Sequence, residues 1–309
     1  MNRREFLVAS AAIPALAQAT PTLAAPKRAL RIAHLTDIHV QPERKAQQGL
    51  EACLAHAQSL KDKPNLVMTG GDLVMDSLGA DPARLKQQWD IFTSVFRQNC
   101  SLPVEHCLGN HDVWGWNDIG KYGNEPKFGK AYAQDRLELA QPYRSFDRAG
   151  WHFVVLDSTH RKTEGNGYTA RLDDEQFAWL ADDLAKTPKT TPIFVLSHIP
   201  ILAVCSMFDG ENEKTGNWVI PGAWMHIDAR RIKDLFAKHP NVKLCVSGHE
   251  HLHDQILYNG VTYVCAGAVC GGWWGGDYYE CTYGYSVIDL FRDGTFRHEY
   301  MKYGWKTQA

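Results

Sequence analysis

Short runs of apolar and β-branched residues alternate along the chain with longer amphipathic runs of helical period. Strands are predicted at residues 30–36, 65–69, 103–108, 151–157, 192–197 and 242–247. Helices are predicted at residues 45–61, 84–98, 173–186 and 228–238. Beyond them, Asn259-Gly260 and Asp293-Gly294 turns separate further strands. Alternation followed by hairpins favours an α/β sandwich with mixed sheets, built as one domain over residues 26–309.

The first 25 residues follow the pattern of an export signal. The pair Arg3-Arg4, followed by Phe6-Leu7 and an alanine-rich apolar stretch, resembles the twin-arginine signal. Pro14 interrupts this stretch, which is shorter than the roughly 20 residues that a membrane anchor needs. We therefore expect a signal peptide at residues 1–25, passage through the bacterial twin-arginine export machinery, and a periplasmic or secreted mature protein.

Composition narrows the classes of function without selecting one. The formal net charge is -2, so no basic excess indicates a nucleic-acid-binding surface. None of the eight cysteines forms a C-x-x-C pair, which argues against a zinc knuckle or a thioredoxin-like motif. In an oxidising compartment Cys100 would pair with Cys107, or Cys270 with Cys281, and the sequence leaves both pairings open.

Polar residues of metal-binding type directly follow five of the predicted strands. These segments are Asp37-Ile38-His39, Gly70-Gly71-Asp72, Gly109-Asn110-His111-Asp112, Ser197-His198 and Gly248-His249-Glu250-His251. In an open α/β sheet, ligands bind at the carboxyl ends of the strands. Residues two apart in an extended segment point to the same side, so we expect Asp37 and His39 to reach one ion together. The same spacing relates His249 to His251.

The types of these side chains indicate which metals they bind. Imidazole and carboxylate ligands suit Mn, Fe, Zn or Ni better than Ca or Mg alone. Seven ligand-type residues are too many for one ion, and they suit two ions that share a carboxylate, as in displacement at phosphorus. Gly71, Gly109 and Gly248 permit tight turns and a close approach of the backbone.

The order D-x-H, G-D, G-N-H-D, H and G-H-x-H, complete between Asp37 and His251, resembles the calcineurin-like metallophosphoesterase superfamily. The resemblance implies a four-layer αββα sandwich of two mixed sheets flanked by helices. It implies a first metal held by Asp37, His39 and His251, a second held by Asn110, His198 and His249, and Asp72 as the bridge. It further implies that a hydroxide between the metals attacks phosphorus and that His111, oriented by Asp112, assists the leaving group.

Two departures from family patterns narrow the expected activity. Met75 stands where purple acid phosphatases carry a tyrosine, and the stretch from Gly71 to Ser77 lacks the arginine of protein Ser/Thr phosphatases. The chain is therefore more similar to the bacterial cyclic-nucleotide-phosphodiesterase-like branch, and a small-molecule phosphodiester is the favoured substrate. Two alternatives stay open: a phosphomonoesterase or nucleotidase with the same metals, and a non-catalytic periplasmic protein that binds metal or ligand.

Candidate substrate-binding residues lie outside the metal-binding segments. Residues 113–133 and 205–225 fit neither strand nor helix period, and long irregular segments of compact domains often carry function. We expect the glycine-framed pair Trp273-Trp274 to form an aromatic wall beside the metals, although such a pair also suits core packing. His160 is a further candidate for contact with the substrate phosphate.

Overall fold

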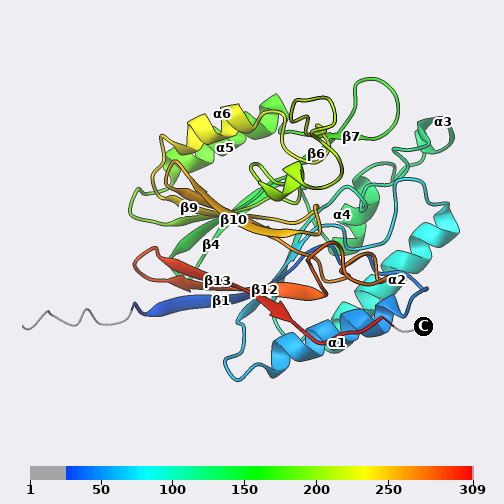
Figure 1. The fold of residues 1–309 in the computed structure, drawn as a ribbon, viewed down its shortest axis with the longest axis horizontal. Helices are drawn as coiled ribbons and strands as arrows, with labels where there is room; N and C mark the ends of the chain where they lie inside the picture. Colours follow the sequence, from blue (N-terminus) through cyan, green and yellow to red (C-terminus); the bar gives the residue numbers. More distant parts are fainter. Residues whose placement is uncertain (1–25, 308–309) are drawn as a thin grey trace, which may run out of the picture.

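The computed structural model describes residues 26–307, which form two mixed β-sheets packed face to face (Figure 1). The first sheet has the order β13-β12-β1-β2-β3 and contains β1 (Arg28–Leu35), β2 (Leu66–Gly70), β3 (Val104–Cys107), β12 (Gly284–Phe291) and β13 (Phe296–Lys302). Strands β1, β2 and β3 are parallel, and β12 and β13 form an antiparallel hairpin beside β1.

The second sheet has the order β10-β11-β9-β8-β5-β4. It contains β4 (Arg144–Arg148), β5 (Trp151–Val155), β8 (Ile193–Leu196), β9 (Val242–Ser247), β10 (His253–Tyr258) and β11 (Val261–Ala266). Its central strands β5, β8, β9 and β11 are parallel, and each edge strand is antiparallel to its neighbour. A separate small hairpin joins β6 (Thr159–Arg161) to β7 (Tyr168–Ala170).

Helices cover the outer face of each sheet (Figure 1). Helices α1 (Ala46–Ser59) and α2 (Pro82–Asn99) pack on the first sheet, and α5 (Asp174–Lys186) and α6 (Ala229–Phe236) pack on the second. Shorter helices are α3 (Ile119–Tyr122), α4 (Ala131–Leu137) and the 3₁₀ turn η1 (Cys205–Met207). The layer order is αββα, so the predicted fold class is confirmed.

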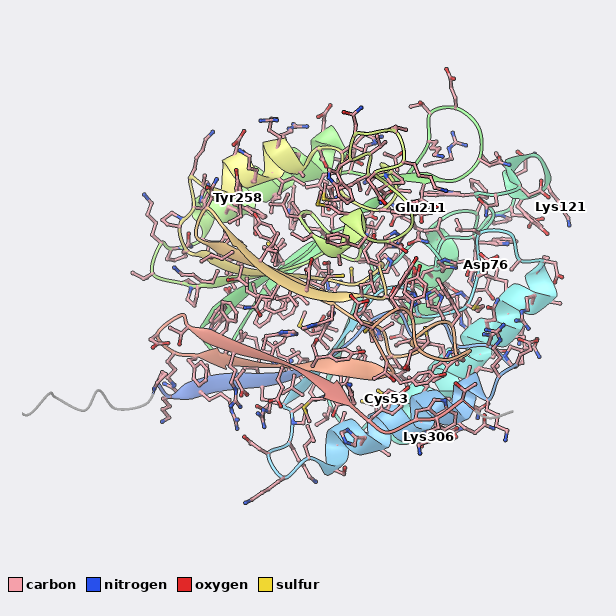
Figure 2. All side chains as sticks on the ribbon, viewed as in Figure 1. Cys53, Asp76, Lys121, Glu211, Tyr258 and Lys306 are labelled. Carbon is pink, nitrogen blue, oxygen red and sulfur yellow. The ribbon has the colours of Figure 1, made fainter. Side chains whose placement is uncertain are left out.

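Local sequence explains the long helices and the position of the sheets. The Asp81 carboxylate caps α2 by accepting from the backbone N–H groups of Ala83 and Arg84, and Pro82 occupies the first turn. Between the sheets, alternate strand residues such as Met68 and Phe153 are fully buried. Side chains fill the spaces between the layers (Figure 2), which fixes the carboxyl ends of the parallel strands relative to one another.

Other predictions concern the export signal and the disulfide bonds. The predicted export signal, residues 1–25, lies outside the described residues. Within residues 26–307, no helix combines the length and the apolar character needed to cross a membrane. Both suggested disulfide pairings are absent from the described structure, where the four cysteines concerned carry free thiols: Cys100, Cys107, Cys270 and Cys281.

Trp274 belongs to the core, so the expectation that it lines a substrate pocket is wrong. Its side chain is 1% exposed and lies against α1, where Gly49 leaves room for the ring. The indole Nε1–H donates to the carbonyl oxygens of Ile38 and His39, at 3.0 Å each. Trp274 therefore holds the loop after β1 in place through hydrogen bonds to its backbone.

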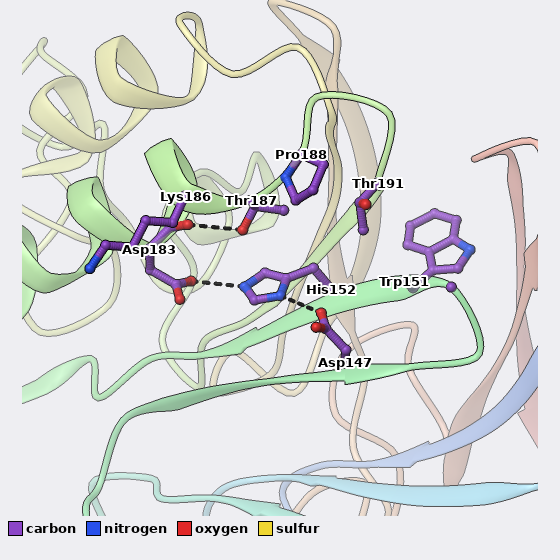
Figure 3. Close-up of a pocket in the computed structure, with 9 residues that line it drawn as sticks. Asp147, Trp151, His152, Asp183, Lys186, Thr187, Pro188 and Thr191 are labelled. Carbon is purple, nitrogen blue, oxygen red and sulfur yellow. Dashed lines mark hydrogen bonds and ion pairs between the residues drawn. The ribbon is translucent and has the colours of Figure 1, made fainter.

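His152 lies at a surface pocket, where its hydrogen bonds link β5 to β4 and to α5 (Figure 3). Its Nδ1 donates to Asp147 Oδ1 at 2.7 Å, and its Nε2 donates to Asp183 Oδ2 at 2.9 Å. Because both ring nitrogens donate, the ring is an imidazolium, and the Asp183 hydrogen bond raises the His152 pKa against the effect of burial. Burial acts to raise the Asp183 pKa, but the hydrogen bonds from His152 and Ser145 lower it.

The stability that His152 contributes depends on pH. Its raised folded-state pKa means that this stability is complete below about pH 6.5, its unfolded value, and is lost as pH rises through the folded value. The lowered pKa of Asp183 makes its own share complete above about pH 4 and lost as pH falls further.

We expect His152→Asn to lower the free energy of unfolding by roughly 1 kcal/mol between pH 5 and 6, and by less above pH 8, in urea denaturation. The control is Asp182→Asn, which removes an exposed partner of Lys186 on α5, the helix that also carries Asp183. A pH-independent effect of His152→Asn contradicts this account.

The contact between Gly49 and Trp274 predicts that alanine at position 49 destabilises the protein, whereas helix propensity alone predicts that it stabilises the protein. Alanine is normally favoured over glycine inside a helix by about 0.5–1 kcal/mol. A Cβ at Gly49 would lie 2.1 Å from Cζ3 of Trp274, so we expect Gly49→Ala to lower the free energy of unfolding by roughly 1–3 kcal/mol. Gly120→Ala in α3, where a Cβ meets nothing within 4 Å, is the matched control and should be neutral or stabilising. Equal stability of the two variants in urea titrations refutes the packing argument.

Candidate active site

The five polar segments predicted from the sequence converge at one edge of the sandwich. They directly follow the parallel strands β1, β2, β3, β8 and β9. The seven side chains expected to bind metal are all almost completely buried there: Asp37, His39, Asp72, Asn110, His198, His249 and His251. Their burial at a sheet edge, away from the main core, requires partners for every polar atom.

The backbone that carries five of these side chains is not extended. The φ angles of Asp37, His39 and Asp72 are 53°, 45° and 51°, and those of His249 and His251 are 75° and 56°. All five residues therefore adopt the left-handed conformation, which L-residues other than glycine rarely occupy. Asp37 Oδ1 and His39 Nε2 lie 4.0 Å apart, close enough to face one ion, but the extended geometry from which this was predicted is wrong.

Buried carboxylates fix the loops by accepting backbone hydrogen bonds. Asp37 accepts from the N–H of His249, 2.9 Å from Oδ2, and Asp72 Oδ1 accepts from the N–H of His111 at 2.8 Å. Glycine is required opposite each carboxylate, because a Cβ at Gly248 or Gly109 would lie 2.2 Å from its oxygen. These contacts confirm that the glycines allow a close backbone approach.

Three histidines have their ring orientation set by backbone carbonyls. The Nδ1–H groups of His198, His251 and His111 donate to the carbonyl oxygens of Gly70, Gly271 and Met75, at 2.7, 2.6 and 2.7 Å respectively. In the neutral rings this leaves the lone pair on Nε2. A hydrogen bond of this kind on the opposite ring nitrogen is typical of histidines that bind metals.

The donor atoms form two groups that share Asp72. In one group His39 Nε2 lies 3.0 Å from His251 Nε2 and 3.5 Å from Asp72 Oδ2. In the other, His198 Nε2 lies 3.2 Å from Asp72 Oδ1 and 3.1 Å from Asn110 Oδ1. His249 completes the second group, because its ligand atom lies within 4.8 Å of those of Asp72 and His198.

The residues present fit transition-metal ions. The buried Nδ1 atoms of His39 and His249 have no hydrogen-bond partner within the described part of the chain. Imidazole nitrogens that face one another beside carboxylate and amide oxygens form the donor set that suits Zn, Mn or Fe. A bound cation would give a partner to Nδ1 of His249, whereas Nδ1 of His39 lies opposite the Nε2 that faces the first donor group.

The electrostatic environment sets different protonation states among the ligand-type residues. Burial acts to raise the Asp72 pKa, but the nearby His198 and His111 outweigh it and hold the pKa well below its usual range. Burial, followed by the charge of His111, lowers the His39 pKa well below its usual range. Burial and the charge of His198 lower the His249 pKa to about 3. Asp72 is therefore ionised while His39 and His249 are neutral, as metal binding needs. Burial acts to lower the His198 pKa, but Asp72 outweighs it and raises the pKa to about 9, so a metal would have to displace a proton from that ring.

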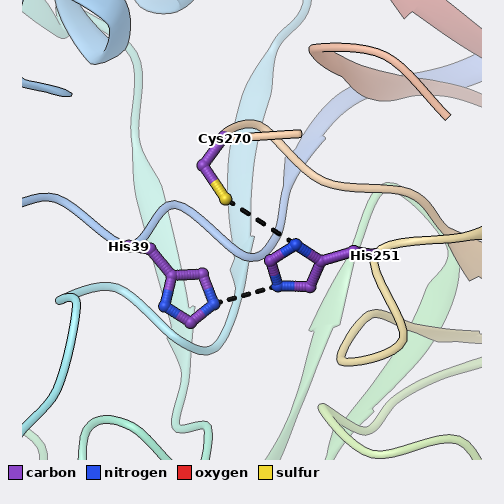
Figure 4. Close-up of side chains that lie close together, drawn as sticks. All are labelled: His39, His251 and Cys270. Atoms are coloured by element: carbon purple, nitrogen blue, oxygen red, sulfur yellow. Dashed lines mark hydrogen bonds between the residues drawn. The ribbon is translucent and has the colours of Figure 1, made fainter. Parts of the chain in front are cut away.

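Cys270 is a neighbour of the site that the sequence did not single out (Figure 4). Its Sγ lies 3.8 Å from Nδ1 of His251, whereas the Nε2 on the other side of that ring faces His39. Burial raises the pKa of the Cys270 thiol well above its usual range, so the thiol stays protonated. Cys270 thus packs behind a ligand-type ring, in a segment whose N–H binds the carbonyl oxygen of Asp37.

Asp112 does not contact the His111 ring, so the expectation that it orients this histidine is wrong. Its Oδ1 accepts from the N–H of Leu73, and its Oδ2 accepts from the N–H of Gly109, each at 2.8 Å. The carboxylate thereby joins the loop after β2 to the loop after β3. His111 is oriented by the carbonyl oxygen of Met75.

A pocket of about 390 Å³ opens over the donor atoms. Its lining is His39, Asp72, Asn110, His111, Tyr168, Asp209, Gly210, Trp224, His249, Glu250, His251, Trp273, Tyr278 and Tyr279. Trp273 lines the pocket as expected, with its ring centroid 4.4 Å from that of His251. His160 is not part of the lining, and its Nδ1 lies 3.8 Å from Asp173 Oδ2, so its predicted contact with substrate is wrong.

Sequence reasoning located only part of this lining. The segment 205–225 contributes Asp209, Gly210 and Trp224, whereas the segment 113–133 contributes no residue. Trp114 and Trp116 of the latter are buried instead. Tyr168, Tyr278 and Tyr279 carry no motif, and only their position near irregular segments could have suggested them. Glu250 lies inside the G-H-x-H segment, but sequence reasoning assigned it no role.

Comparisons with known proteins agree with this geometry. Residues 30–253 match the family described as Calcineurin-like phosphoesterase. The 3',5'-cyclic adenosine monophosphate phosphodiesterase CpdA of Escherichia coli is 24% identical, with 78% of this chain and 76% of that protein covered. The probable glycerophosphodiester phosphodiesterase GpdQ of Arcobacter nitrofigilis is 21% identical, with 76% and 77% covered.

A solved structure shares the fold. A dimetal phosphatase from Danio rerio superposes with a TM-score of 0.61 at 12% identity, covering 90% of this chain and 100% of that one. The sequence match, the relatives and the converging ligand-type residues lead to one assignment. The chain belongs to the calcineurin-like phosphoesterase family and is a metal-dependent phosphoester hydrolase.

Proposed function

We propose that this chain hydrolyses small-molecule phosphodiesters with two metal ions bound at the sheet edge. The observation that carries the proposal is the pair of donor groups that share Asp72 at the base of an open pocket. Asp37, His39 and His251 would hold one ion, and Asn110, His198 and His249 would hold the other. When bound, the ions would make water a better nucleophile and offset the charge of the phosphoryl oxygens.

His111 is suited to assist the leaving group. Its side chain is 27% exposed, while the surrounding ligand-type side chains are buried, so it is open to the pocket. The Met75 carbonyl holds the proton on Nδ1, and Nε2 lies 4.0 Å from Asp72 Oδ2. A protonated Nε2 would donate to the departing ester oxygen as that oxygen gains charge.

The size of the pocket and the relatives support a diester substrate. The pocket extends beyond the metal-binding atoms to Tyr168, Trp224 and Tyr279, which leaves room for a second ester group. The names of two similar proteins, a cyclic adenosine monophosphate phosphodiesterase and a probable glycerophosphodiester phosphodiesterase, describe enzymes that act on diesters.

Hydrolysis of bis(p-nitrophenyl) phosphate by the purified chain tests this function. We expect chelation to abolish activity and Mn, Fe or Zn to restore it, with two ions bound per chain by elemental analysis. The diester rate should exceed that on p-nitrophenyl phosphate. Asp72→Asn and His111→Ala should each lower kcat by about 100-fold or more, because they remove the shared ligand and the proton donor.

The matched control for these variants is His239→Ala, because this histidine lies after α6 and does not line the pocket. Wild-type turnover in Asp72→Asn or His111→Ala refutes the proposal. A preference for the monoester identifies a phosphomonoesterase instead. Tight binding of metal without hydrolysis of either ester identifies a binding protein.

We also propose export through the twin-arginine pathway, on the sequence of residues 1–25 alone. In a bacterium with that pathway, we expect Arg3→Lys combined with Arg4→Lys to retain the full chain in the cytoplasm, as measured by cell fractionation. Lys27→Arg, just beyond the segment, is the control and should be exported. Equal periplasmic fractions of the two variants contradict this route.

A further inference from the structure

The part of the pocket beside the metal-binding atoms is aromatic and acidic. Five rings line it, which we call the aromatic cage: Tyr168, Trp224, Trp273, Tyr278 and Tyr279. Two carboxyl groups, those of Asp209 and Glu250, share the same lining. No lysine or arginine is among the pocket residues in the described part of the chain. This combination favours the binding of a cation and disfavours a second anionic group.

The rings form a corner next to the metal-binding histidines. Trp273 packs against the His251 ring at a centroid distance of 4.4 Å. Tyr278 stands nearly perpendicular to Trp273, at 5.2 Å and 84°, and Tyr279 stands nearly perpendicular to Tyr278, at 4.9 Å and 84°. Perpendicular rings offer both faces and edges to the same open pocket, and the faces carry the negative potential that attracts a cation.

Asp209 is held in the wall of the cage by Tyr278. The Tyr278 hydroxyl donates to Asp209 Oδ1 at 2.6 Å. Next to Asp209, the Trp224 ring lies over Gly210, where a Cβ would be 3.5 Å from the indole. One carboxylate and two aromatic rings are therefore connected within the wall, although Asp209 and Trp224 come from an irregular segment.

Glu250 supplies a second, independent indication. Its side chain is 1% exposed, neither carboxyl oxygen makes a hydrogen bond within the described residues, and Oε1 lies 3.9 Å from Nε2 of His249. A buried carboxyl group without a hydrogen bond is costly, because it has lost its contacts with water. An ammonium group in the adjoining cage would give these oxygens a cationic partner.

Other ligand classes satisfy fewer of these groups. A nucleoside polyphosphate or a bisphosphate would bring a second anion towards Asp209 and Glu250 without meeting a basic side chain. A neutral aromatic group would stack on the rings but would offer nothing to the carboxyl groups. A tetraalkylammonium group suits both, since its methyl groups contact ring faces and its charge faces the Asp209 carboxylate.

We propose that the aromatic cage, with Asp209 and Glu250, binds an alkylammonium group, so that the substrate is a zwitterionic phosphoester of an amino alcohol of the choline or ethanolamine class. This specificity rests on the proposed function, because the phosphate of the same substrate must reach the metal-binding atoms. The cage then selects the ester group, and the metal-binding residues act on the phosphate.

A pair of isosteric diesters tests the role of the charge. One is p-nitrophenyl phosphorylcholine, and the other is p-nitrophenyl 3,3-dimethylbutyl phosphate, in which carbon replaces the ammonium nitrogen. In each hydrolysis the oxygen of water bonds to phosphorus, the bond to the nitrophenyl oxygen breaks, and nitrophenolate and a proton are released. We expect kcat/KM to be about 10-fold or more higher for the choline ester. Equal or higher values for the neutral ester overturn the proposal.

Variants assign the preference to the cage. We expect Asp209→Asn and Trp224→Leu each to reduce the preference for the choline ester to a few-fold, mainly through a higher KM for the choline ester. Glu211→Gln is the matched control, because it alters a charge on the same segment that pairs with Lys214 at the surface. An unchanged preference in both cage variants overturns the assignment of the cage.

Binding without turnover separates this proposal from the proposed function. Tetramethylammonium chloride should bind the metal-loaded chain in calorimetry, and 3,3-dimethyl-1-butanol should bind more weakly. Hydrolysis of bis(p-nitrophenyl) phosphate without selective cation binding refutes the cage and leaves the hydrolase function intact. Selective cation binding, lost in Trp224→Leu, without hydrolysis of any ester supports the cage and refutes the hydrolase function.

Discussion

Buried carboxylates that bind the backbone of neighbouring loops are the interaction on which this site depends. Asp37 binds the N–H of His249, Asp72 binds the N–H of His111, and Asp112 binds the loops after β2 and β3 together. The contacts of Asp37 and Asp72, and that of Asp112 with Leu73, join loops that are distant in sequence and follow different strands. Hydrogen bonds of the chain itself therefore bring the donor atoms together.

The same carboxylates explain how a strained backbone persists. Left-handed φ angles at Asp37, His39, Asp72, His249 and His251 cost about 1 kcal/mol or more each, since none of these residues is glycine. The loop after β1 is fixed in this conformation by two sets of hydrogen bonds. The His249 N–H donates to the Asp37 carboxylate, and the Trp274 indole donates to backbone carbonyl oxygens of the loop. The strain turns each side chain towards the centre, so the backbone geometry is part of the preparation for metal binding.

The sequence contains more information on which residues meet than on how they meet. Apolar periodicity predicted the main strands and helices, and polar residues at strand ends predicted the convergence, because both follow from local patterns. The left-handed turns, the support of His111 by the Met75 carbonyl and the burial of Trp274 depend on contacts between distant segments. No local pattern encodes such contacts, so Asp112, Trp274 and His160 were assigned roles that the structure does not support.

The two halves of the pocket have different structural origins, and this difference bears on specificity. The metal-binding half stands on loops fixed by two sheets, whereas Asp209 and Trp224 stand on an irregular segment outside both sheets. Changes in that segment leave the strand ends and their carboxylate contacts intact, so the ester group that is recognised can vary while the metal-binding geometry is kept. Membership of the family therefore accounts for the reaction on phosphorus, and the cage that we propose would select which phosphoester reaches it.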